Sequence, residues 1–228
     1  MNDTSKDLGK KAAALYAANL IQDDMIIGIG TGSTAGYFIQ FLGQRCQEGL
    51  KVRAVATSEK SKMMAEKSGI AIIDANEVDY VDFDIDGADE INSQKQMIKG
   101  GGGALLREKI VAYMSKEMIV VIDESKRVEK LGKFPLPVEI VPFAYLTTVK
   151  HLNSHGFLGK MRINEKNELF LTDNGNYIYD IYFKNVIDQP LEVERKIKKI
   201  PGVIETGFFL EIAGRVIVGF NDGLVEVR

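Results

Sequence analysis

The segment at residues 82–108, DFDIDGADEINSQKQMIKGGGGALLRE, concentrates the residue types that small-molecule chemistry needs. Asp86 and Asp89 could accept or deliver protons, and Lys99 could stabilise a developing oxyanion. The glycines at 100–103 leave bare backbone that a small anionic ligand can approach closely. Each piece alone has a structural explanation, but their combination in one short segment predicts an active site for a small polar metabolite.

Glu108 is the last carboxylate of this segment, within a stretch, 103–114, that is expected to be helical. On a helix it lies one turn beyond Ala104 and one turn before Val111 and Ala112, which together form a small apolar face. Partial desolvation on such a face would make the carboxylate a stronger base. A surface glutamate paired with a neighbouring lysine is the alternative interpretation.

A second candidate is the loop GIGTGST at residues 28–34, between a strand-like run and a helix-like run. It resembles a dinucleotide fingerprint, but Ser33 stands at the third glycine position. The next expected strand also ends in Thr57 and Ser58 rather than in an acidic residue. Backbone N–H groups at a helix start, together with two hydroxyls, suit a phosphate. We therefore favour a phosphate loop over a purely structural turn or a nicotinamide site.

The aspartates at 82, 84 and 86, followed by Gly87, match the first half of a calcium-binding EF-hand loop. The match fails at the twelfth position, where Ser93 replaces the bidentate glutamate. Asp82 and Asp84 alternate with apolar residues at the period of a strand, so we expect them on a solvated strand face. Asp86 and Asp89 then lie at the carboxyl end of that strand, where ligands bind in open α/β sheets.

The elements that must position these residues alternate between helix and strand along the first part of the chain. Helices are expected at 4–18, 33–42, 58–67 and 103–114, and strands at 25–29, 52–56, 70–73, 80–85 and 118–122. In the first helix, Thr4 and Asp7 resemble a capping pair, and a stripe of Leu8, Ala12, Leu15 and Ala18 is expected to face the core. The alternation predicts right-handed βαβ units and a parallel sheet with helices on both faces.

The pattern changes near residue 131. The segment 131–143 contains three prolines, which predicts an extended crossing between domains. Residues 143–200 then form an α+β pattern, with helices at 146–152 and 191–197, strands at 161–163, 169–171 and 177–183, and a turn at 172–176. The strand-rich end, 205–228, is expected to return to the first sheet.

Composition limits the class of protein. A chain of 228 residues with 45% hydrophobic and 27% charged residues is typical of one large or two small soluble domains. The net charge of −3 argues against a general nucleic-acid binder, and the single Cys46 excludes an internal disulfide. The amino-terminal segment lacks the apolar core of a signal peptide, and no apolar run is long enough to span a bilayer. We expect a cytoplasmic protein with no nucleic-acid or membrane partner.

Five blocks, in order along the chain, closely resemble the A-type ribose-5-phosphate isomerase family. They are GIGTGSTA at 28–35, DGADEIN at 86–92, KGGGGALLREK at 99–109, LGKFPLPVEI at 131–140 and TDNGN at 172–176. Gly103 departs from the pattern, since many members have alanine there. The resemblance implies a cofactor-free interconversion of ribose 5-phosphate and ribulose 5-phosphate in the non-oxidative pentose phosphate pathway. Because the carboxylates lack a complete set of metal ligands, we also expect catalysis to need no metal.

The resemblance also implies the architecture: an α/β fold with a Rossmann-like, mainly parallel sheet and a smaller α+β, ferredoxin-like domain. The expected domains are 1–132 with 206–228 for catalysis, and 133–205 as a lid and oligomerisation domain. The partners it implies are the small sugar phosphate substrate and a second copy of the chain, as a homodimer or a homotetramer.

By the same resemblance, Glu108 corresponds to the base that moves the proton, and Asp86, Asp89 and Lys99 are the other catalytic residues. The implied substrate-binding residues are Thr31, Gly32, Ser33, Thr34, Asp86, Gly87, Ala88, Asp89, Lys99, Gly100, Gly101, Gly102 and Lys126.

Two alternatives come from related scaffolds. A sugar-phosphate-binding regulator would need a DNA-binding module, and the βαβ pattern begins almost at the first residue. An amino-sugar-phosphate deaminase would favour a well-placed histidine, but His151 and His155 both fall in the expected small domain.

Overall fold

The computed structural model describes the backbone of residues 5–228 and the side chains from residue 7 onward. Thr4 of the expected capping pair therefore lies outside the described residues. The chain forms two compact units. The first contains the residues up to Ala88, Arg107–Lys126 and Ile212–Arg228, and the second contains Asp89–Leu106 and Arg127–Glu211. These boundaries differ from the expected domains chiefly because residues 89–106 cluster with the second unit. The roles assigned to the two domains stay predictions.

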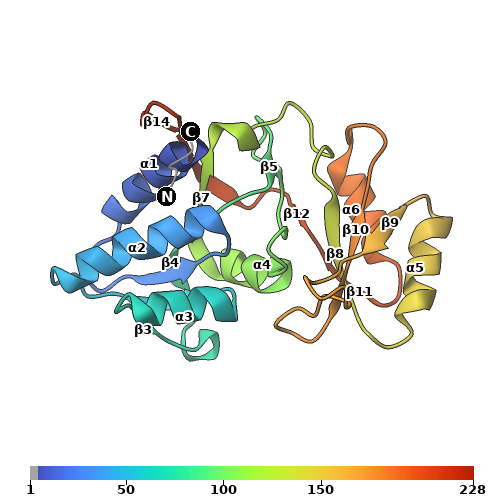
Figure 1. The fold of residues 1–228 in the computed structure, drawn as a ribbon, viewed down its shortest axis with the longest axis horizontal. Helices are drawn as coiled ribbons and strands as arrows, with labels where there is room; N and C mark the ends of the chain where they lie inside the picture. Colours follow the sequence, from blue (N-terminus) through green and yellow to red (C-terminus); the bar gives the residue numbers. More distant parts are fainter. Residues whose placement is uncertain (1–4) are drawn as a thin grey trace. The chain divides into compact units, whose positions relative to one another are not determined.

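A seven-stranded sheet in the order β14-β13-β7-β4-β1-β2-β3 forms the centre of the first unit (Figure 1). The strands are β1 (Ile26–Ile29), β2 (Arg53–Ala56), β3 (Ala71–Ile72), β4 (Val81–Asp86), β7 (Ser115–Asp123), β13 (Ala213–Gly219) and β14 (Val225–Val227). All neighbours are parallel except β13 and β14. The chain winds outward in one direction from β1 and in the other from β4. The point between these strands is the switch point at which open α/β sheets bind ligands.

Helices cover both faces of this sheet, as the sequence predicts. Helices α1 (Ser5–Asn19), α2 (Ser33–Gln47) and α3 (Glu59–Lys67) pack into one apolar cluster that contains Ile27 and Ile29 of β1. Helix α4 (Leu105–Met114) places Val111 in a second cluster with Ile26. Because successive side chains of a strand point to opposite faces, the two clusters lie on opposite sides of the sheet.

The buried face of α1 matches the expected stripe at Ala18 but not at the two leucines. Leu8 and Leu15 are 44% and 45% exposed, whereas the fully buried residues are four alanines, Ala13, Ala14, Ala17 and Ala18. The helix approaches the sheet too closely for larger side chains, since a Cβ atom on Gly9 would lie 2.7 Å from the carbonyl oxygen of Gly219. Close packing thus outweighs hydrophobicity in selecting the buried face.

The second unit contains a ferredoxin-like module, as expected. Its elements are β8 (Leu136–Ile140), α5 (Tyr145–Ser154), β9 (Gly159–Met161), β10 (Tyr177–Ile181), α6 (Pro190–Lys198) and β11 (Val203–Thr206). The antiparallel sheet has the order β11-β8-β10-β9. Leu152 of α5 and Ile197 of α6 belong to one core cluster with Val138 and Tyr179, so both helices cover the same face. The expected strand at 169–171 forms only isolated bridges.

The proline-rich segment 131–143 is not a linker, contrary to the sequence prediction. It contains β8, an interior strand paired with both β10 and β11. Leu136, Val138 and Ile140 alternate with Pro137 and Glu139, and this strand period outweighs the prolines. Pairing with β11 begins at Val138, and Pro137 contributes its carbonyl oxygen, which accepts from the Gly207 N–H at 2.7 Å.

A further small sheet, β12-β6-β5, was not predicted. Its strands β5 (Glu90–Ile91), β6 (Met97–Ile98) and β12 (Phe208–Phe209) have two residues each, too few for an alternating pattern. The expectation that the strand-rich end returns to the first sheet therefore holds for β13 and β14 and is wrong for β12.

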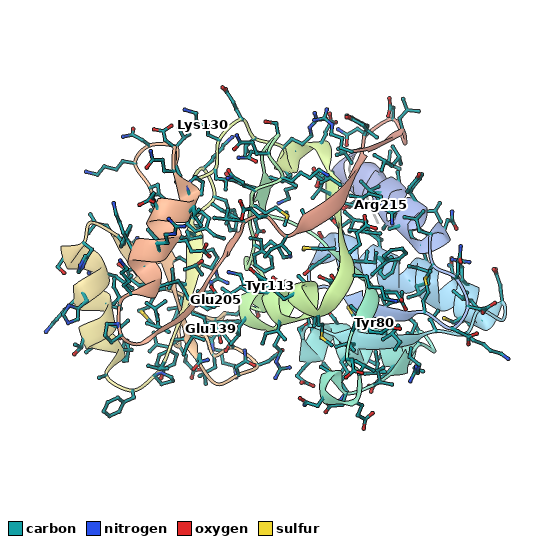
Figure 2. All side chains as sticks on the ribbon, turned by 180° about the vertical axis from the view of Figure 1, so that it is seen from behind. Tyr80, Tyr113, Lys130, Glu139, Glu205 and Arg215 are labelled. Atoms are coloured by element: carbon teal, nitrogen blue, oxygen red, sulfur yellow. The ribbon has the colours of Figure 1, made fainter. Side chains whose placement is uncertain are left out.

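The TDNGN block serves a structural purpose. Glu139, labelled in Figure 2, is fully buried in β8. Its Oε1 accepts hydrogen bonds from Thr172 Oγ1 at 3.0 Å, Asn174 Nδ2 at 3.2 Å and Asn176 Nδ2 at 2.9 Å. The turn residues supply the donors that a buried carboxylate needs.

Candidate active site

In the first unit, the loops that follow parallel strands meet at one edge of the sheet. The loop after β1 leads into α2 at Ser33, and β4 ends at Asp86, with its loop beginning at Gly87. Lys126, half-buried, ends the short 3-10 helix η2 (Glu124–Lys126) that follows β7. Because β1 and β4 are neighbours at the switch point, residues 31–34 and 86–88 lie at the carboxyl ends of adjacent strands.

Asp86 joins these two loops. It is fully buried, and its Oδ1 accepts the backbone N–H of Thr31 at 3.1 Å and that of Gly87 at 2.7 Å. Gly30 makes this possible, because a Cβ atom there would lie 2.0 Å from Asp86 Oδ1. Gly30, which in the sequence resembles part of a dinucleotide fingerprint, is therefore required because the Asp86 carboxylate lies against its backbone.

The hydroxyl of Thr31 belongs to a cluster that sequence reasoning missed. Thr31 Oγ1 donates to Ser58 Oγ at 2.8 Å and lies 3.0 Å from Thr57 Oγ1. Ser61 Oγ donates to the Gly30 carbonyl at 2.7 Å, which ties the loop to α3. The sequence signal that could have indicated this hydroxyl cluster is the pair Thr57-Ser58 after β2. A dinucleotide site would have an acidic residue there.

The amino-terminal end of α2 is open to an anion. Gly32 occupies the N-cap position with φ of 112° and provides no side-chain cap. Ser33 is exposed and Thr34 is buried at the first turn. The helix start therefore presents backbone N–H groups, one exposed hydroxyl and the positive end of the helix dipole, which is the arrangement expected of a phosphate loop.

Glu108 lies on α4 and is only 2% exposed. Its interpretation as a surface glutamate is therefore wrong, and the expected desolvation is confirmed. Asp84 was expected on a solvated face, and that prediction is also wrong, since it is fully buried. A Cβ atom on Gly28 would lie 2.6 Å from both Asp84 Oδ1 and Val111 Cγ1, so this face of the sheet is covered by α4. Strand alternation cannot distinguish a solvated face from one covered by a helix.

The second unit holds the remaining predicted site residues. The Asp89 N–H donates to the Ile98 carbonyl at 2.9 Å, and Asp89 Oδ2 accepts the Gly101 N–H at 2.8 Å. Lys99 is 2% exposed, and its Nζ lies 5.3 Å from the centroid of the Phe209 ring. Asp89 and the glycine run therefore meet within this unit, and Lys99 directly precedes the run.

The glycine run forms a tight turn whose middle is exposed. The Gly103 N–H donates to the Gly100 carbonyl at 3.0 Å, and Gly101 and Gly102 are exposed between them. A Cβ atom on Gly101 would lie 2.7 Å from Asp89 Oδ1. At Gly103, φ is +85° and a Cβ atom would lie 2.5 Å from Phe170 Cε1, so this chain uses glycine at the position where it departs from the family pattern.

No cluster of three or more histidine, cysteine or acidic side chains suited to holding a metal occurs from residue 7 onward. None of the helices in the described part of the chain combines the length and the apolar character needed to cross a membrane.

The fold and these residues define an α/β protein with a phosphate-type loop, buried carboxylates and a glycine-rich turn, the class that binds small anionic metabolites. Residues 53–223 match the family model of ribose 5-phosphate isomerase A, also called phosphoriboisomerase A. The chain is 54% identical to ribose-5-phosphate isomerase A of Protochlamydia amoebophila, over 99% of this chain and 97% of that protein. It is 48% identical to ribose-5-phosphate isomerase A of Bacillus mycoides, over 95% of this chain and 98% of that protein. The chain belongs to the ribose 5-phosphate isomerase A family.

Solved structures agree. The enzyme from Methanocaldococcus jannaschii superposes with a TM-score of 0.91 at 41% identity, covering 99% of both chains. A D-ribose-5-phosphate isomerase in complex with phospho-erythronic acid also superposes with a TM-score of 0.91 at 41% identity, covering 96% of both chains. The resemblance drawn from the five sequence blocks is confirmed, and the regulator and deaminase alternatives are not favoured.

Proposed function

We propose that this chain interconverts D-ribose 5-phosphate and D-ribulose 5-phosphate in the non-oxidative pentose phosphate pathway. The observation that supports this most strongly is full-length similarity to isomerases of that name, at up to 54% identity. The reaction moves a carbonyl group between C1 and C2 of the open-chain sugar. A proton must leave the carbon next to the carbonyl and return to the neighbouring carbon, through a planar enediolate.

Glu108 is the proposed base. One carboxylate above the plane of the enediolate can remove the proton from one carbon and deliver it to the other. General-base catalysis of this kind contributes on the order of 10²–10⁴-fold. The burial of Glu108 on a helix supports the assignment, because a catalytic group needs a fixed position and restricted access to water.

Lys99 and the backbone of the glycine turn at residues 100–102 are proposed to stabilise the enediolate oxygen, except for the Gly101 N–H, which donates to Asp89 Oδ2. The exposed middle of the glycine turn supports this, since its backbone is open to a ligand. Asp86 and Asp89, with Gly87 and Ala88 between them, are proposed to bind the sugar hydroxyls. The two carboxylates would accept hydroxyl protons and assist opening of the furanose ring.

The phosphate group is proposed to bind at residues 31–34 and Lys126. The uncapped start of α2 and the exposed Ser33 hydroxyl support this. The Thr31 hydroxyl takes part in the cluster with Thr57 and Ser58, and the Thr31 N–H donates to Asp86, so Thr31 would hold the loop in the shape that receives the phosphate. A phosphate held away from the reacting carbons orients the sugar and lowers the entropic cost of reaction.

We further propose that the reaction needs no cofactor or metal, and that the protein acts in the cytoplasm as a homodimer or a homotetramer. Large exposed apolar side chains support an oligomerisation role for the second unit. They include Phe143, Leu146, Leu158 and Tyr182, of which Phe143 is 89% exposed.

The direct test is incubation of the purified protein with ribose 5-phosphate and no added cofactor, with ¹³C NMR detection of ribulose 5-phosphate. We expect equilibration of the two sugars and very slow turnover of free ribose. Absence of ketose formation would overturn the proposed reaction, and equal turnover of ribose would overturn the phosphate assignment. Ammonia release from an amino-sugar phosphate would instead indicate the deaminase.

A further inference from the structure

Arg162 makes four hydrogen bonds through one partly buried guanidinium group in the second unit. Its Nη1 donates to the carbonyl oxygens of Gly100 at 2.8 Å and Gly101 at 3.1 Å. Its Nε and Nη2 donate to the two carboxylate oxygens of Asp180 at 2.9 and 2.5 Å. The two side chains are only 15% and 13% exposed. An ion pair in this setting is shielded from water and geometrically specific.

The bonds to Gly100 and Gly101 determine where two N–H groups point. In a planar trans peptide the carbonyl and the following N–H point in opposite directions. The Gly100 carbonyl faces Arg162, and the Gly101 N–H of the same peptide donates to Asp89 Oδ2 at 2.8 Å. The Gly101 carbonyl also faces Arg162, so the Gly102 N–H is directed away from Arg162 as well. One side chain thus orients two successive peptides of the exposed turn.

Arg162 is itself held firmly. Its N–H donates to the Ile178 carbonyl at 2.8 Å, and its carbonyl accepts the Phe170 N–H at 2.9 Å. Its guanidinium carbon lies 5.9 Å from the centroid of the Phe170 ring. Asp180 lies in β10, between the paired residues Pro137 of β8 and Lys160 of β9. The Arg162–Asp180 pair therefore connects the sheet of the ferredoxin-like module to the glycine turn.

We propose that Arg162, oriented by Asp180, is a positioning residue that aims the N–H groups of Gly101 and Gly102 and holds the Asp89 carboxylate in place. This inference rests on the proposed function, in which the turn backbone at Gly102 stabilises the enediolate and Asp89, which accepts the Gly101 N–H, binds a sugar hydroxyl. Arg162 touches the turn from the side of its carbonyls, so it acts through the backbone.

The test compares Arg162→Met, Arg162→Lys and Asp180→Asn with the wild type, using ribose 5-phosphate. Arg195→Met is the matched control, since Arg195 is an exposed arginine of the same unit, paired with Glu192 on α6. We expect kcat to fall by about 10- to 100-fold in Arg162→Met, less than the roughly 10²–10³-fold that loss of an oxyanion-hole donor costs. KM should change by less than about threefold, because the affected bonds strengthen in the transition state.

Arg162→Lys separates positioning from stability. A lysine can restore the ion pair with Asp180, but a point charge cannot bridge two carbonyls and a carboxylate in one plane. We therefore expect a melting temperature close to that of the wild type and a kcat that stays low. Asp180→Asn should lower kcat in the same direction, and Arg195→Met should leave it unchanged. A folded Arg162→Lys or Arg162→Met protein with wild-type kcat would overturn the proposal.

A second measurement does not depend on turnover. Hydrogen–deuterium exchange of a peptide covering residues 99–106 should become faster in Arg162→Met than in Arg195→Met, because the turn loses two of its anchoring bonds. Unchanged exchange would also overturn the positioning role. If the wild type does not isomerise ribose 5-phosphate, the proposed function fails while faster exchange still supports the anchoring of the turn.

Discussion

Glu108 differs from the other carboxylates of the candidate site in how it is held. Asp86 Oδ1 accepts two backbone N–H groups, and Asp89 Oδ2 accepts one, so these oxygens already serve as hydrogen-bond acceptors within loops. Glu108 projects from a helix and is almost fully buried. A side chain that must alternately take and return a proton benefits from a rigid support, whereas a loop carboxylate that organises backbone is better suited to binding hydroxyls.

We predict that Glu108→Gln lowers kcat by at least about 10²-fold while ribose 5-phosphate still binds, because the amide keeps the shape but cannot accept a proton. Stopped assays would give kcat, and calorimetry would give the affinity. In heavy water, the wild type should incorporate deuterium at the carbon that receives the proton, and this incorporation should almost disappear in the variant. The exposed Glu66 provides the control variant Glu66→Gln, which should behave as the wild type. A folded Glu108→Gln protein with near wild-type turnover would make Asp86 or Asp89 the next candidate for the base.

The single cysteine gives a prediction for pH dependence. Burial raises the pKa of the Cys46 thiol above its ordinary value, and the charge of neighbouring Arg45 only partly offsets this. Since the thiolate is the reactive species, iodoacetamide should label native Cys46 more slowly than the urea-denatured chain near pH 8. The ratio of the two rates should approach one as the pH rises above the raised pKa. Mass spectrometry would measure both rates, and equal rates near pH 8 would contradict the prediction.

At the scale of elements, the loop between β1 and α2 depends on how closely β1 and β4 approach. Gly30 has no room for a side chain, since Asp86 occupies the space that a Cβ atom would fill. The same loop is held from α3 by Ser61 and from β2 by Thr57. The phosphate-type loop is thus shaped by three neighbouring elements. Close packing, as well as ligand binding, therefore requires glycine at residue 30.

We predict that Gly30→Ala destabilises the protein by about 1–3 kcal/mol or more, because the added methyl group overlaps Asp86. Gly36→Ala is the matched variant within α2. There a Cβ atom meets only the mobile methyl end of Met64, at 3.3 Å, and alanine should stabilise the helix by about 0.5–1 kcal/mol. Urea denaturation would measure both. Equal stability of the two variants would show that the contact between Gly30 and Asp86 is not tight in solution.

At the scale of the whole molecule, the chain passes repeatedly between the two units, and the proposed site residues are divided between them. Residues 86–88, Glu108 and Lys126 belong to the first unit, and Asp89, Lys99 and the glycine turn belong to the second. The block DGAD at residues 86–89 therefore contains the boundary between the two units, which lies between Ala88 and Asp89. This division is finer than the expected domains, which place residues 89–106 in the first domain.

We predict that chelation leaves turnover of ribose 5-phosphate unchanged, because the described carboxylates do not form a complete set of metal ligands with one another or with a histidine. The measurement is kcat after prolonged dialysis against EDTA, with a subsequent addition of Mg²⁺, Mn²⁺ or Zn²⁺. Loss of activity that a divalent ion restores would contradict a metal-free reaction.

The sequence by itself determined the βαβ order of the first unit, the two helices of the ferredoxin-like module, and the family, since these depend on local period and short motifs. It also indicated the burial of Glu108, because its neighbours one turn away, Ala104, Val111 and Ala112, are apolar. These features are encoded in residues close together along the chain.

Only the tertiary structure decided the features that depend on contact between distant segments. The burial of Asp84 requires α4 to cover its face, and the alanine face of α1 requires a close approach to the sheet. The four bonds of Arg162 bring together Asp180 of β10 and a turn some 60 residues away from Arg162. Such contacts follow from packing in three dimensions, and no local periodicity reports which distant side chain will fill a given space.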